Sequence, residues 1–490
     1  MGIHQKQGEF WVEPVELSSR IPEEHILRKL SRVLDLGFVR EAVAPCYGRN
    51  GHVSLDPVII VKMMVLLFLD NVRSERELMR IIPLRLDYLW YLGYGLDDAV
   101  PSHSVLSKAR KRWGTEVFAR LFRETVGRCL EAGLIDGEKV HADSSDIRAN
   151  ASRNSVVDTF LEETLKKLDG EASEPEGEEP RPVKLPRKAD GVNRTRRSKT
   201  DPDATLKSKG RGESVPSYKN HRVVDDRAGV VTAITTTAGT VSEAHKLEEL
   251  IDQHEANTEA SVRVATADSL YGTAENFIAL AKRGIRTHMG DLRSKQNNHH
   301  LKGILPTEAF RYEKQTDTYT CPAGNRLRWR HWNGRRNYAE YEARASDCAH
   351  CPLRPQCTRA KGGRTVNRRP EQELLDKARR QSASTAGKAD RRRRQHLQER
   401  NFADAANLHG FKRSRWRGLL RQSIQDLLIA AVQNLRTLAR GARKALWPST
   451  AALREEPARA FSLSAGLLAA LFALFPLPLT RHSRLRCALR

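Results

Sequence analysis

The sequence has few of the features that mark secreted or membrane proteins. Its first residues lack an apolar stretch followed by a small-residue cleavage site, so we expect no secretory signal. The most apolar late stretch, 463–479, is shorter than the roughly 20 residues that a membrane span needs, and Pro476 and Pro478 interrupt it. Only 7 of the 490 residues are cysteine, which favours a reducing compartment. These absences predict a cytoplasmic protein with no membrane partner.

Acidic residues are few relative to basic ones. The chain has 84 Lys and Arg against 60 Asp and Glu, which gives a formal net charge of +24. Each Lys or Arg that meets a phosphate releases condensed counterions, so this excess favours a polyanionic partner. Nucleic acid is the commonest such partner, and an anionic membrane surface is the alternative. At 490 residues the chain is long enough for two or three domains.

Residues 1–133 read as a helical domain. Leu27, Leu30 and Leu34 recur at helix spacing, and Asp56 followed by Pro57 has the form of a helix start before the apolar stretch 58–69. The last expected helix of this region carries basic residues, namely Lys108, Arg110, Lys111 and Arg112. A basic helix in a small helical domain favours DNA binding, although a solvated basic face on an ordinary bundle fits the pattern equally well.

Residues 134–289 alternate short strands with helices, which predicts an α/β domain with a mixed five-stranded sheet. Strands are expected through Val140 to Asp143, on both sides of the turn 225–229, over 262–268 and over 284–289. One helix is expected after Ser242 and another after Gly272. The segment 168–216 is rich in Glu, Pro, Lys, Arg and Ser, and we expect it to be a flexible charged loop.

Residues 290–389 interrupt this alternation and contain four clustered cysteines. Cys348 and Cys351 have the spacing of a zinc chelate, and Cys321 and Cys357 could complete a tetrahedral site. The five residues between Cys351 and Cys357 are a less typical spacing, so free thiols or a redox pair are the alternatives. The pattern favours a structural Zn²⁺ ion in a Cys-rich insertion.

Residues 390–440 predict two helices joined by a basic turn. Ile424, Leu428 and Leu435 belong to one apolar stripe, which we expect in the core. The turn places Lys412, Arg413, Arg415 and Arg417 around Trp416. Basic residues with an aromatic ring can hold a phosphate backbone and stack on an unpaired base, while an inward-packed Trp416 on a solvated turn is the alternative. The sequence assigns no role to residues 441–490.

Two of the expected strands end in an aspartate, at Asp143 and Asp268. The carboxyl ends of adjacent strands are where α/β proteins build their sites. Two neighbouring carboxylates repel each other unless a cation lies between them, so the pair favours a hard divalent metal ion such as Mg²⁺. Glu399, on the helix that follows the insertion, could supply a third ligand. For either aspartate alone, a turn or cap role is the plainer alternative.

Three motifs surround these acids: VHADSSDIRANAS at Asp143, VATADSLYGTAENF at Asp268 and QERNFADAANLHGFKRSRWRGL at Glu399. Their content and order resemble those of bacterial insertion-sequence DDE transposases, in the subgroup with a cysteine-containing insertion. The resemblance covers about residues 21–440. It implies a ribonuclease H-like catalytic core, 134–289 with 390–440, which follows a helical DNA-binding domain.

The resemblance also implies what the site does. Asp143, Asp268 and Glu399 would hold two Mg²⁺ or Mn²⁺ ions for cleavage and strand transfer at terminal inverted repeats. The implied partners are double-stranded DNA, both element ends and target, in a homodimer or larger assembly at the bacterial nucleoid. Arg400 joins the basic helix and the basic turn as an expected DNA contact. The alternatives are a catalytically weakened relic that only binds DNA and a ribonuclease H-like nuclease that does not join strands.

The sequence departs from the family pattern at three positions. Family members often carry a Tyr and an Arg ahead of the glutamate and a Lys seven residues after it, where this chain has Arg392, Gln395 and Ala406. The resemblance implies that this Lys contacts a DNA phosphate, so the site lacks one expected positive charge. Nearby arginines are candidates to replace it: Arg391, Arg393, Arg394 and Arg400.

Overall fold

The computed structural model describes residues 16–48, 54–159, 192–208, 213–292 and 303–446. The described residues up to Leu438 form one compact unit, which contains the candidate site. Among the described residues, every helix is either too short or too polar to span a lipid bilayer.

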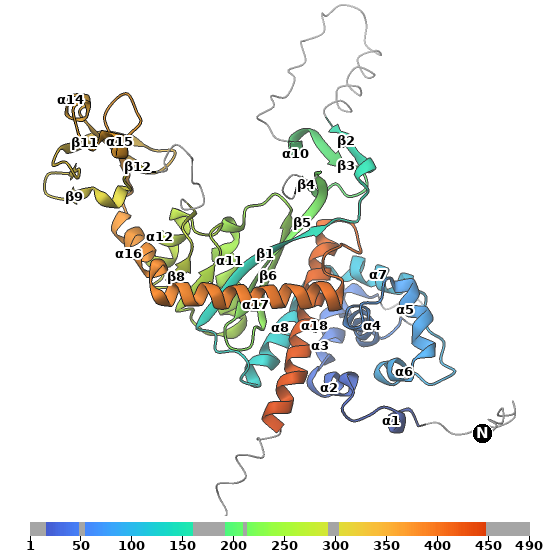
Figure 1. Ribbon diagram of the computed structural model, residues 1–490. Helices are drawn as coiled ribbons and strands as arrows, with labels where there is room; N and C mark the ends of the chain where they lie inside the picture. Colours follow the sequence, from blue (N-terminus) through green and yellow to red (C-terminus); the bar gives the residue numbers. More distant parts are fainter. Residues whose placement is uncertain (1–15, 49–53, 160–191, 209–212, 293–302, 447–490) are drawn as a thin grey trace, which may run out of the picture. The chain divides into compact units, whose positions relative to one another are not determined.

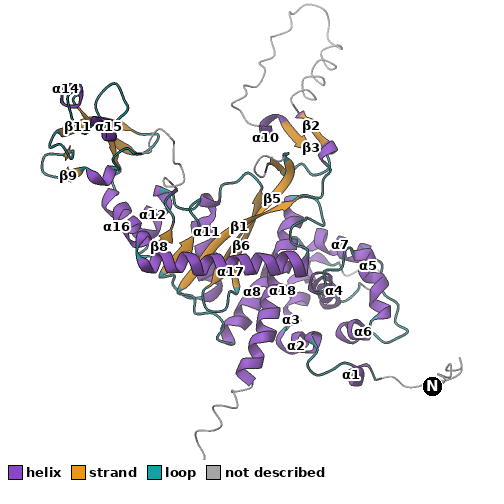
Figure 2. Ribbon diagram, in the orientation of Figure 1, coloured by secondary structure: helices purple, strands orange, loops and turns teal. Residues whose placement is uncertain are grey.

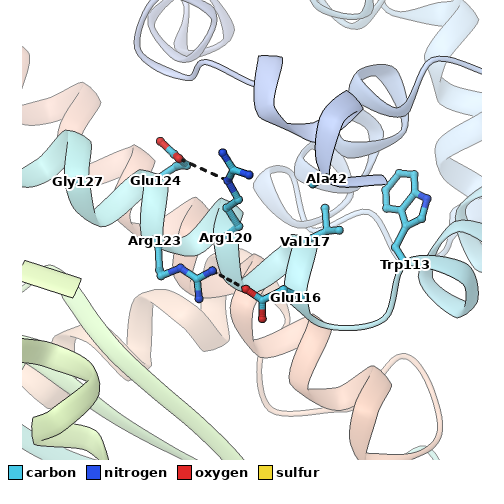
Figure 3. Close-up of a pocket in the computed structure, with 8 residues that line it drawn as sticks. All are labelled: Ala42, Trp113, Glu116, Val117, Arg120, Arg123, Glu124 and Gly127. Atoms are coloured by element: carbon cyan, nitrogen blue, oxygen red, sulfur yellow. Dashed lines mark hydrogen bonds and ion pairs between the residues drawn. The ribbon is translucent and has the colours of Figure 1, made fainter. Parts of the chain in front are cut away.

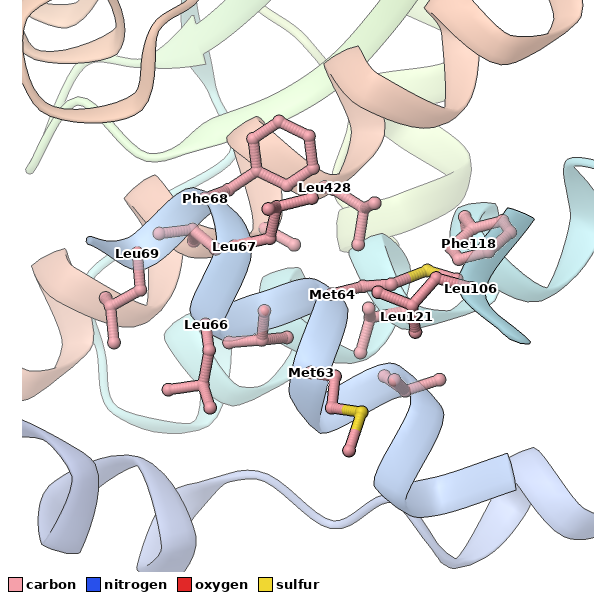
Figure 4. Packing of buried hydrophobic residues seen from close by; sticks show 14 of the residues in the cluster. Met63, Met64, Leu66, Leu67, Phe68, Leu69, Leu106, Phe118, Leu121 and Leu428 are labelled. Atoms are coloured by element: carbon pink, nitrogen blue, oxygen red, sulfur yellow. The ribbon is translucent and has the colours of Figure 1, made fainter. Parts of the chain in front are cut away.

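The described N-terminal part is helical, as the sequence predicts. At its centre lies α4 (Pro57–Leu69), which begins where the Asp56 carboxylate accepts a hydrogen bond from the Val58 amide. Almost every residue of α4 after Ile59 is buried, because helices surround it on all sides. Figure 4 shows Met64 and Phe68 among the side chains of three of these helices, α7 (Ser104–Trp113), α8 (Glu116–Glu131) and α18 (Leu419–Leu446). The other helices of this part are α1 (Leu17–Arg20), α2 (Ile26–Val33), α3 (Gly37–Val43), α5 (Glu75–Ile81) and α6 (Leu86–Leu92).

A mixed sheet follows, with β1 (Lys139–Arg148) at its centre (Figure 2). β1 pairs antiparallel with β5 (Val215–Asp225) and parallel with β7 (Val264–Ala267). The strand order is β4–β5–β1–β7–β8, and β6 pairs with β5 as well, so the sheet has six strands rather than the expected five. The remaining strands are β4 (Thr205–Lys207), β6 (Val231–Ala238) and β8 (Arg286–Met289).

The extra strand, β4, lies in the segment that the sequence predicts to be a flexible loop. Residues 168–191 and 209–212 of that region lie outside the described residues, but residues 192–208 form α10 (Val192–Thr195), β3 (Arg196–Ser198) and β4. β3 pairs with β2 (Val156–Asp158). The buried Asp201 accepts a hydrogen bond from the Tyr218 hydroxyl at 2.5 Å, which ties this segment to β5. The expectation of a loop is therefore wrong for 192–208, because distant partners order a locally polar stretch.

Helices cover the two faces of the sheet. α11 (Leu247–Thr258) and α12 (Ala274–Lys282) pack on the face that carries Val140 and Ala142 of β1. The other face is covered by α8, α18 and α17 (Thr385–His409), and Figure 1 shows α17 running across the strands. Successive residues of a strand point to opposite faces, so Asp143 shares the α17 face with His141. The apolar stripe of α18 is buried, which confirms its expected place in the core.

A second, separate sheet forms between β8 and the α17 helix. Its order is β13–β12–β11–β10–β9, all antiparallel, and it encloses a small core around Tyr319, Leu327 and Tyr341. Cys348 lies in the short helix α14, Cys357 ends the short helix α15, and Cys351 lies between the two helices. The longer helix α16 (Gln372–Ala383) then leads back to α17. The bounds are β9 (Arg311–Glu313), β10 (Thr318–Thr320), β11 (Arg326–Asn333), β12 (Tyr338–Ala343), α14 (Ala345–Ala349), α15 (Arg354–Cys357) and β13 (Thr365–Arg368).

Candidate active site

Asp143 and Asp268 lie level with each other on neighbouring parallel strands. His141 of β1 is paired with Thr266 of β7, and each aspartate follows two residues later in the chain, Asp143 within β1 and Asp268 directly after the end of β7. Neighbouring strands are about 4.8 Å apart, and the alternation of side chains puts both carboxylates on the α17 face. The charge of Asp268 also raises the pKa of Asp143, which shows that the two groups interact. The structure therefore brings these two predicted residues together.

The position of Asp143 within its strand differs from the prediction. β1 does not end at Asp143 but continues to Arg148, because the long strand β5 pairs with it over its whole length. Only the parallel neighbour β7 ends here, at Ala267, so Asp268 is the residue at a strand end. The site lies at the end of β7 and alongside the middle of β1.

The nearest positive charge to Asp143 is Arg394 of α17. Its Nη1 atom donates to Asp143 Oδ2 at 2.6 Å, and the Ser144 amide donates to Oδ1 at 2.8 Å. Burial raises the pKa of Asp143, while the guanidinium of Arg394 opposes that rise. The Nε atom of Arg394 is buried without a hydrogen-bond partner among the described residues. Asp143 thus lies in an environment where a negative charge needs a cation beside it.

The loop after Asp268 is held by a close backbone approach. A Cβ atom at Gly272 would lie 1.8 Å from the Gly290 carbonyl oxygen, so only glycine fits there. The preceding Tyr271 is fully buried, and its hydroxyl has no hydrogen-bond partner among the described residues. Burial, together with the charges of Asp143 and Asp268, raises the pKa of Tyr271 well above its usual range. The Tyr-Gly pair of the second motif therefore shapes the floor of the site.

Glu399 is on α17 but does not share the position of Arg394. The two residues are five apart, which separates them by about 140° around a helix of 3.6 residues per turn. Glu399 is exposed and accepts a hydrogen bond from Gln395 Nε2 at 2.9 Å. Among the described residues, no group of three or more His, Cys, Asp or Glu side chains is arranged to hold a metal ion. The structure therefore brings Asp143 and Asp268 together, whereas Glu399 is exposed on the surface of α17.

The helix itself is fixed to the sheet on either side of Arg394. Gln398 Nε2 donates to the His141 carbonyl at 2.6 Å, and Asp390 accepts from His288 and Lys139. Arg393 pairs with Asp226 of the β5–β6 turn, and Arg391 donates to the Ser382 carbonyl. Of the four arginines considered as replacements for the missing Lys, only Arg394 reaches Asp143, and Arg400 is exposed.

The phenylalanine of the third motif has a structural role that the sequence alone did not suggest. Arg222 lies opposite Asp143 on β5 and is completely buried. Its guanidinium lies over the rings of Phe402 and Phe411, at 4.4 and 4.8 Å from their centroids, and donates to Asn401 Oδ1 at 2.6 Å. Burial lowers the pKa of Arg222 to about 10. This stacked cation fixes the register of α17 beside the aspartates.

The basic turn is attached to the far end of β1. The Arg148 amide donates to the Lys412 carbonyl at 3.0 Å, and the Ser414 amide donates to the Arg148 carbonyl at 2.8 Å. Lys412 Nζ donates to Ser145 Oγ at 2.5 Å, and Ser145 is on the same face of β1 as Asp143, two residues further along. The turn thus places a lysine on the face of β1 that carries Asp143, two residues further along the strand, a relationship that sequence distance conceals.

Three of the predicted DNA-contact residues have partners inside the protein. Arg110 is buried and pairs with Glu75, and its guanidinium lies 3.7 Å from the Trp416 ring centroid. Trp416 also packs edge-on against Phe68, with centroids 5.7 Å apart. Arg415 donates to the Leu67 and Val72 carbonyls at the end of α4. These three residues join the helical N-terminal part to the basic turn. Trp416 is packed inward, which is the second of the two interpretations of the basic turn given by the sequence.

The other predicted DNA-contact residues are exposed. They lie on α7, on α17 and in the basic turn, and they are Lys108, Lys111, Arg112, Arg400, Lys412, Arg413 and Arg417.

The four clustered cysteines line one small cavity of the second sheet, with Leu305 and Arg364 at its edge. All four are free thiols. Burial raises the pKa of Cys357, and the other three thiols add to that rise. In the observed side-chain conformations, however, the described residues offer no three-ligand metal group here either. Zinc would require the thiols to rotate toward one another.

Neither aspartate lines either of two larger hollows. A cleft of about 820 Å³ separates the start of α12 from the second sheet and contains Tyr312, Arg368 and Arg379 among its lining residues. The other, of about 740 Å³, lies over α8 beside Ala42 of α3 (Figure 3). Its arginines are paired along the helix, Arg120 with Glu124 and Arg123 with Glu116, so its charge is largely neutralised.

Comparison with known proteins gives two family matches. A model described as Transposase DDE domain matches residues 320–439, and one described as Transposase domain (DUF772) matches residues 15–112. Glu399 falls in the first match, and both aspartates lie between the two. Curated proteins give no match. Among solved structures, the chain is similar to piggyBac transposase in a cryo-EM synaptic complex with hairpin DNA. The identity is 9% and the TM-score 0.30, over 94% of this chain and 86% of that one, a likeness too low to define the fold.

Proposed function

Because the chain is an insertion-sequence DDE transposase by family, we propose that it cuts DNA at the ends of an element and joins those ends to target DNA. The observation that carries the proposal is the level pair Asp143 and Asp268 on neighbouring parallel strands. The proposed substrate is double-stranded DNA with terminal inverted repeats. Cutting two ends together calls for a homodimer or a larger assembly.

Asp143 and Asp268 are the proposed ligands of the catalytic metal, with Glu399 as the third. Mg²⁺ and Mn²⁺ accept a few carboxylates and fill their other positions with water and phosphate oxygens, so this pair suits them. The carboxylate of Asp143, already paired with a guanidinium, marks a position that favours positive charge. Two bound ions would lower the pKa of the attacking oxygen and stabilise the leaving oxygen in an in-line transfer.

Glu399 must move relative to the pair for the three acids to meet. It lies about 140° around α17 from Arg394, so either its side chain reaches around the helix or the helix turns. Among the described residues its carboxylate accepts a hydrogen bond only from Gln395 on its own helix, so no tie to another element holds it away from the site. Release of Arg394 from Asp143 would accompany this change, since Arg394 and a metal ion compete for the same carboxylate.

The chain's own basic residues would bind and orient the DNA. Lys412, beside Ser145, supplies the positive charge that the family has where this chain carries Ala406. The exposed Lys108 and Lys111 of α7 would contact phosphates further from the cut, together with Arg112, Arg400, Arg413 and Arg417. Phosphate contacts of this kind fix the position of a duplex without reading its sequence.

A structural Zn²⁺ ion is proposed for Cys321, Cys348, Cys351 and Cys357. The support is chemical, since four thiols that line one cavity can complete a tetrahedral site after rotation of their side chains. The ion would stabilise the second sheet and take no part in phosphoryl transfer.

The proposal is tested with a duplex that carries the element's end sequence, in the presence of Mg²⁺. We expect nicked and strand-joined products from the unmodified chain, and neither product from Asp143→Asn or Asp268→Asn, with DNA binding retained. Asp146→Asn is the matched control, because Asp146 is on the same strand but pairs with Lys207. Activity that survives either catalytic substitution would show that the site is wrong.

The same assay separates the two alternatives. Nicks without joined products would identify a plain nuclease of this fold. Binding to the duplex without any cleavage by the unmodified chain would identify a relic that retains only its DNA contacts.

A further inference from the structure

Strand β11 of the second sheet carries two solvent-exposed tryptophans. Trp329 is 53% exposed and Trp332 is 47% exposed. The other large apolar side chains with comparable exposure in the described part of the chain are all leucines. An indole ring is a large apolar surface, so two of them in water within four residues mark a binding surface more often than an accident of packing.

A bulge in β11 turns both indoles to the same face of the sheet. In a regular strand, residues three apart point to opposite faces. Here the register shifts between Trp329 and His331, so Trp329 lies opposite Tyr341 and Trp332 lies opposite Ala339. Those partners are two residues apart on β12, which places the two rings roughly 7 Å apart along the strand. Two flat apolar faces at this spacing form a short platform.

The platform is set in a strongly basic segment. Residues 326–336 contain five arginines and one histidine, and no acidic residue. Arg330 pairs with Glu340 and Glu342, whereas Arg326, Arg328, Arg335 and Arg336 have no ion pair to any described residue. Residues 303–370 as a whole contain 14 Lys and Arg against 6 Asp and Glu. The charge therefore favours an anionic partner for this surface.

We propose that β11 binds unpaired DNA bases, with Trp329 and Trp332 each stacked on one base. In a duplex both faces of a base are covered by its neighbours, so the rings would select an opened or single strand. Alternation puts Arg326 and Arg328 on the opposite face, so the nearest phosphate contacts are expected from Arg335 and Arg336 in the following turn. The inference rests on the proposed function only in taking DNA as the substrate, since cutting and joining expose unpaired strand ends.

A second copy of the chain is a poorer occupant of this surface. A self-contact across a two-fold axis would bring the arginine-rich strand against itself, and like charges at close range oppose such pairing. Stacking on bases avoids that repulsion, because the phosphates of the same strand offset the arginines.

The test compares the affinity of the full chain for a labelled single-stranded oligonucleotide and for the matching duplex at one salt concentration. We expect Trp329→Ala and Trp332→Ala each to weaken single-strand binding roughly ten-fold and to leave duplex binding unchanged. The double substitution to Phe should retain most of the single-strand affinity, because a phenyl ring still stacks. Leu84→Ala is the matched control, since Leu84 is 81% exposed on a different part of the chain.

Unchanged single-strand affinity in the double alanine variant would overturn the inference, as would an equal loss for both forms of DNA. A change in sedimentation alone, with DNA binding intact, would overturn it in favour of a protein contact. If the unmodified chain binds and cuts the duplex while the tryptophan variants behave normally, only this inference fails. If the unmodified chain binds no DNA of either form, the proposed function fails as well.

Discussion

Arg394 donates to Asp143 across 251 residues of sequence, at 2.6 Å between Nη1 and Oδ2. The guanidinium therefore lies where the proposed function needs a metal ion. A buried carboxylate is stabilised by one neighbouring cation, but a guanidinium and a divalent ion at the same oxygen repel each other. Arg394 and a divalent ion would therefore compete for the same carboxylate oxygen of Asp143.

Removing that guanidinium should strengthen metal binding. We expect Arg394→Gln to lower the apparent dissociation constant for Mn²⁺ about five- to ten-fold in the absence of DNA, which corresponds to about 1 kcal/mol for a partly buried ion pair. Isothermal titration of the full chain measures this directly. Arg393→Gln is the control, because Arg393 is adjacent in sequence but pairs with Asp226. Weaker Mn²⁺ binding in the Arg394 variant would mean that the arginine supports the metal site rather than competing for it.

The exposed lysines of α7 should contribute to DNA binding through phosphates. The double substitution of Lys108 and Lys111 to Ala is expected to reduce the slope of log affinity against log salt by about 2, because each phosphate that is no longer neutralised lowers the slope by roughly 0.9. Fluorescence anisotropy at several salt concentrations provides the slope.

Arg415 serves as the contrasting case. Arg415→Gln should lower the melting temperature, because it leaves the Leu67 and Val72 carbonyls without their donor, yet the folded variant should keep the original salt slope. The division between exposed and inward-facing residues would be contradicted by either of two results. One is an α7 variant whose slope of log affinity against log salt equals that of the unmodified chain, and the other is a reduced slope in Arg415→Gln.

If the four clustered cysteines bind zinc, the purified chain should contain a fixed amount of that metal. Elemental analysis of the purified chain should find about one zinc per chain, bound as in other four-cysteine sites. Replacing Cys348 and Cys351 by Ser should remove it, because half of the ligands are then missing, whereas Cys46→Ser should not, since Cys46 is exposed and outside the cluster. Zinc-free protein in which all four thiols react freely would rule the site out.

The buried carboxyl group of Asp426 should make the free energy of unfolding depend on pH. Burial raises its pKa to about 6 from an ordinary value of 3.8, although Asn220, Thr236 and Gln422 donate to it. A folded-state pKa above the unfolded value means that the stability contribution is fully present below about pH 4 and is lost as pH rises through about 6. At pH 8 the ionised carboxylate costs up to about 3 kcal/mol.

Asp426→Asn should therefore raise the free energy of unfolding at pH 8 and have little effect near pH 4. The new amide group has an acceptor available, because Gln422 Oε1 is buried without a hydrogen-bond partner among the described residues. Urea unfolding at the two pH values measures the difference. A stabilisation that does not vary with pH would contradict the assigned pKa.

The sequence predicts best the elements that depend on local pattern. The N-cap at Asp56, the apolar α4 and the stripe of α18 are all found as expected, because periodicity and capping act over a few residues. The pairing of the strands that carry Asp143 and Asp268 is also found, although β1 continues to Arg148 and only β7 ends beside its aspartate. For these features the neighbouring residues contain most of the information.

Other features depend on partners far away in the chain, and no local pattern indicates them. β4 forms because it pairs with the edge of β5, and β1 extends past Asp143 because β5 is long enough to pair with it. Trp416 turns inward because Arg110 and Phe68 lie on the helical part that it meets. The common face of Trp329 and Trp332 exists only because a bulge shifts the register, and a single strand's pattern does not reveal a bulge.

The central claim is that Asp143, Asp268 and Glu399 meet at one divalent metal site. The most direct measurement replaces Mg²⁺ by Fe²⁺ in the full chain bound to end DNA, generates hydroxyl radicals at the metal, and maps the resulting breaks in the polypeptide. The account predicts breaks near residues 143, 268 and 399, all lost in Asp143→Asn. Breaks at 143 and 268 without any near 399, or a pattern that Asp143→Asn leaves unchanged, would contradict it.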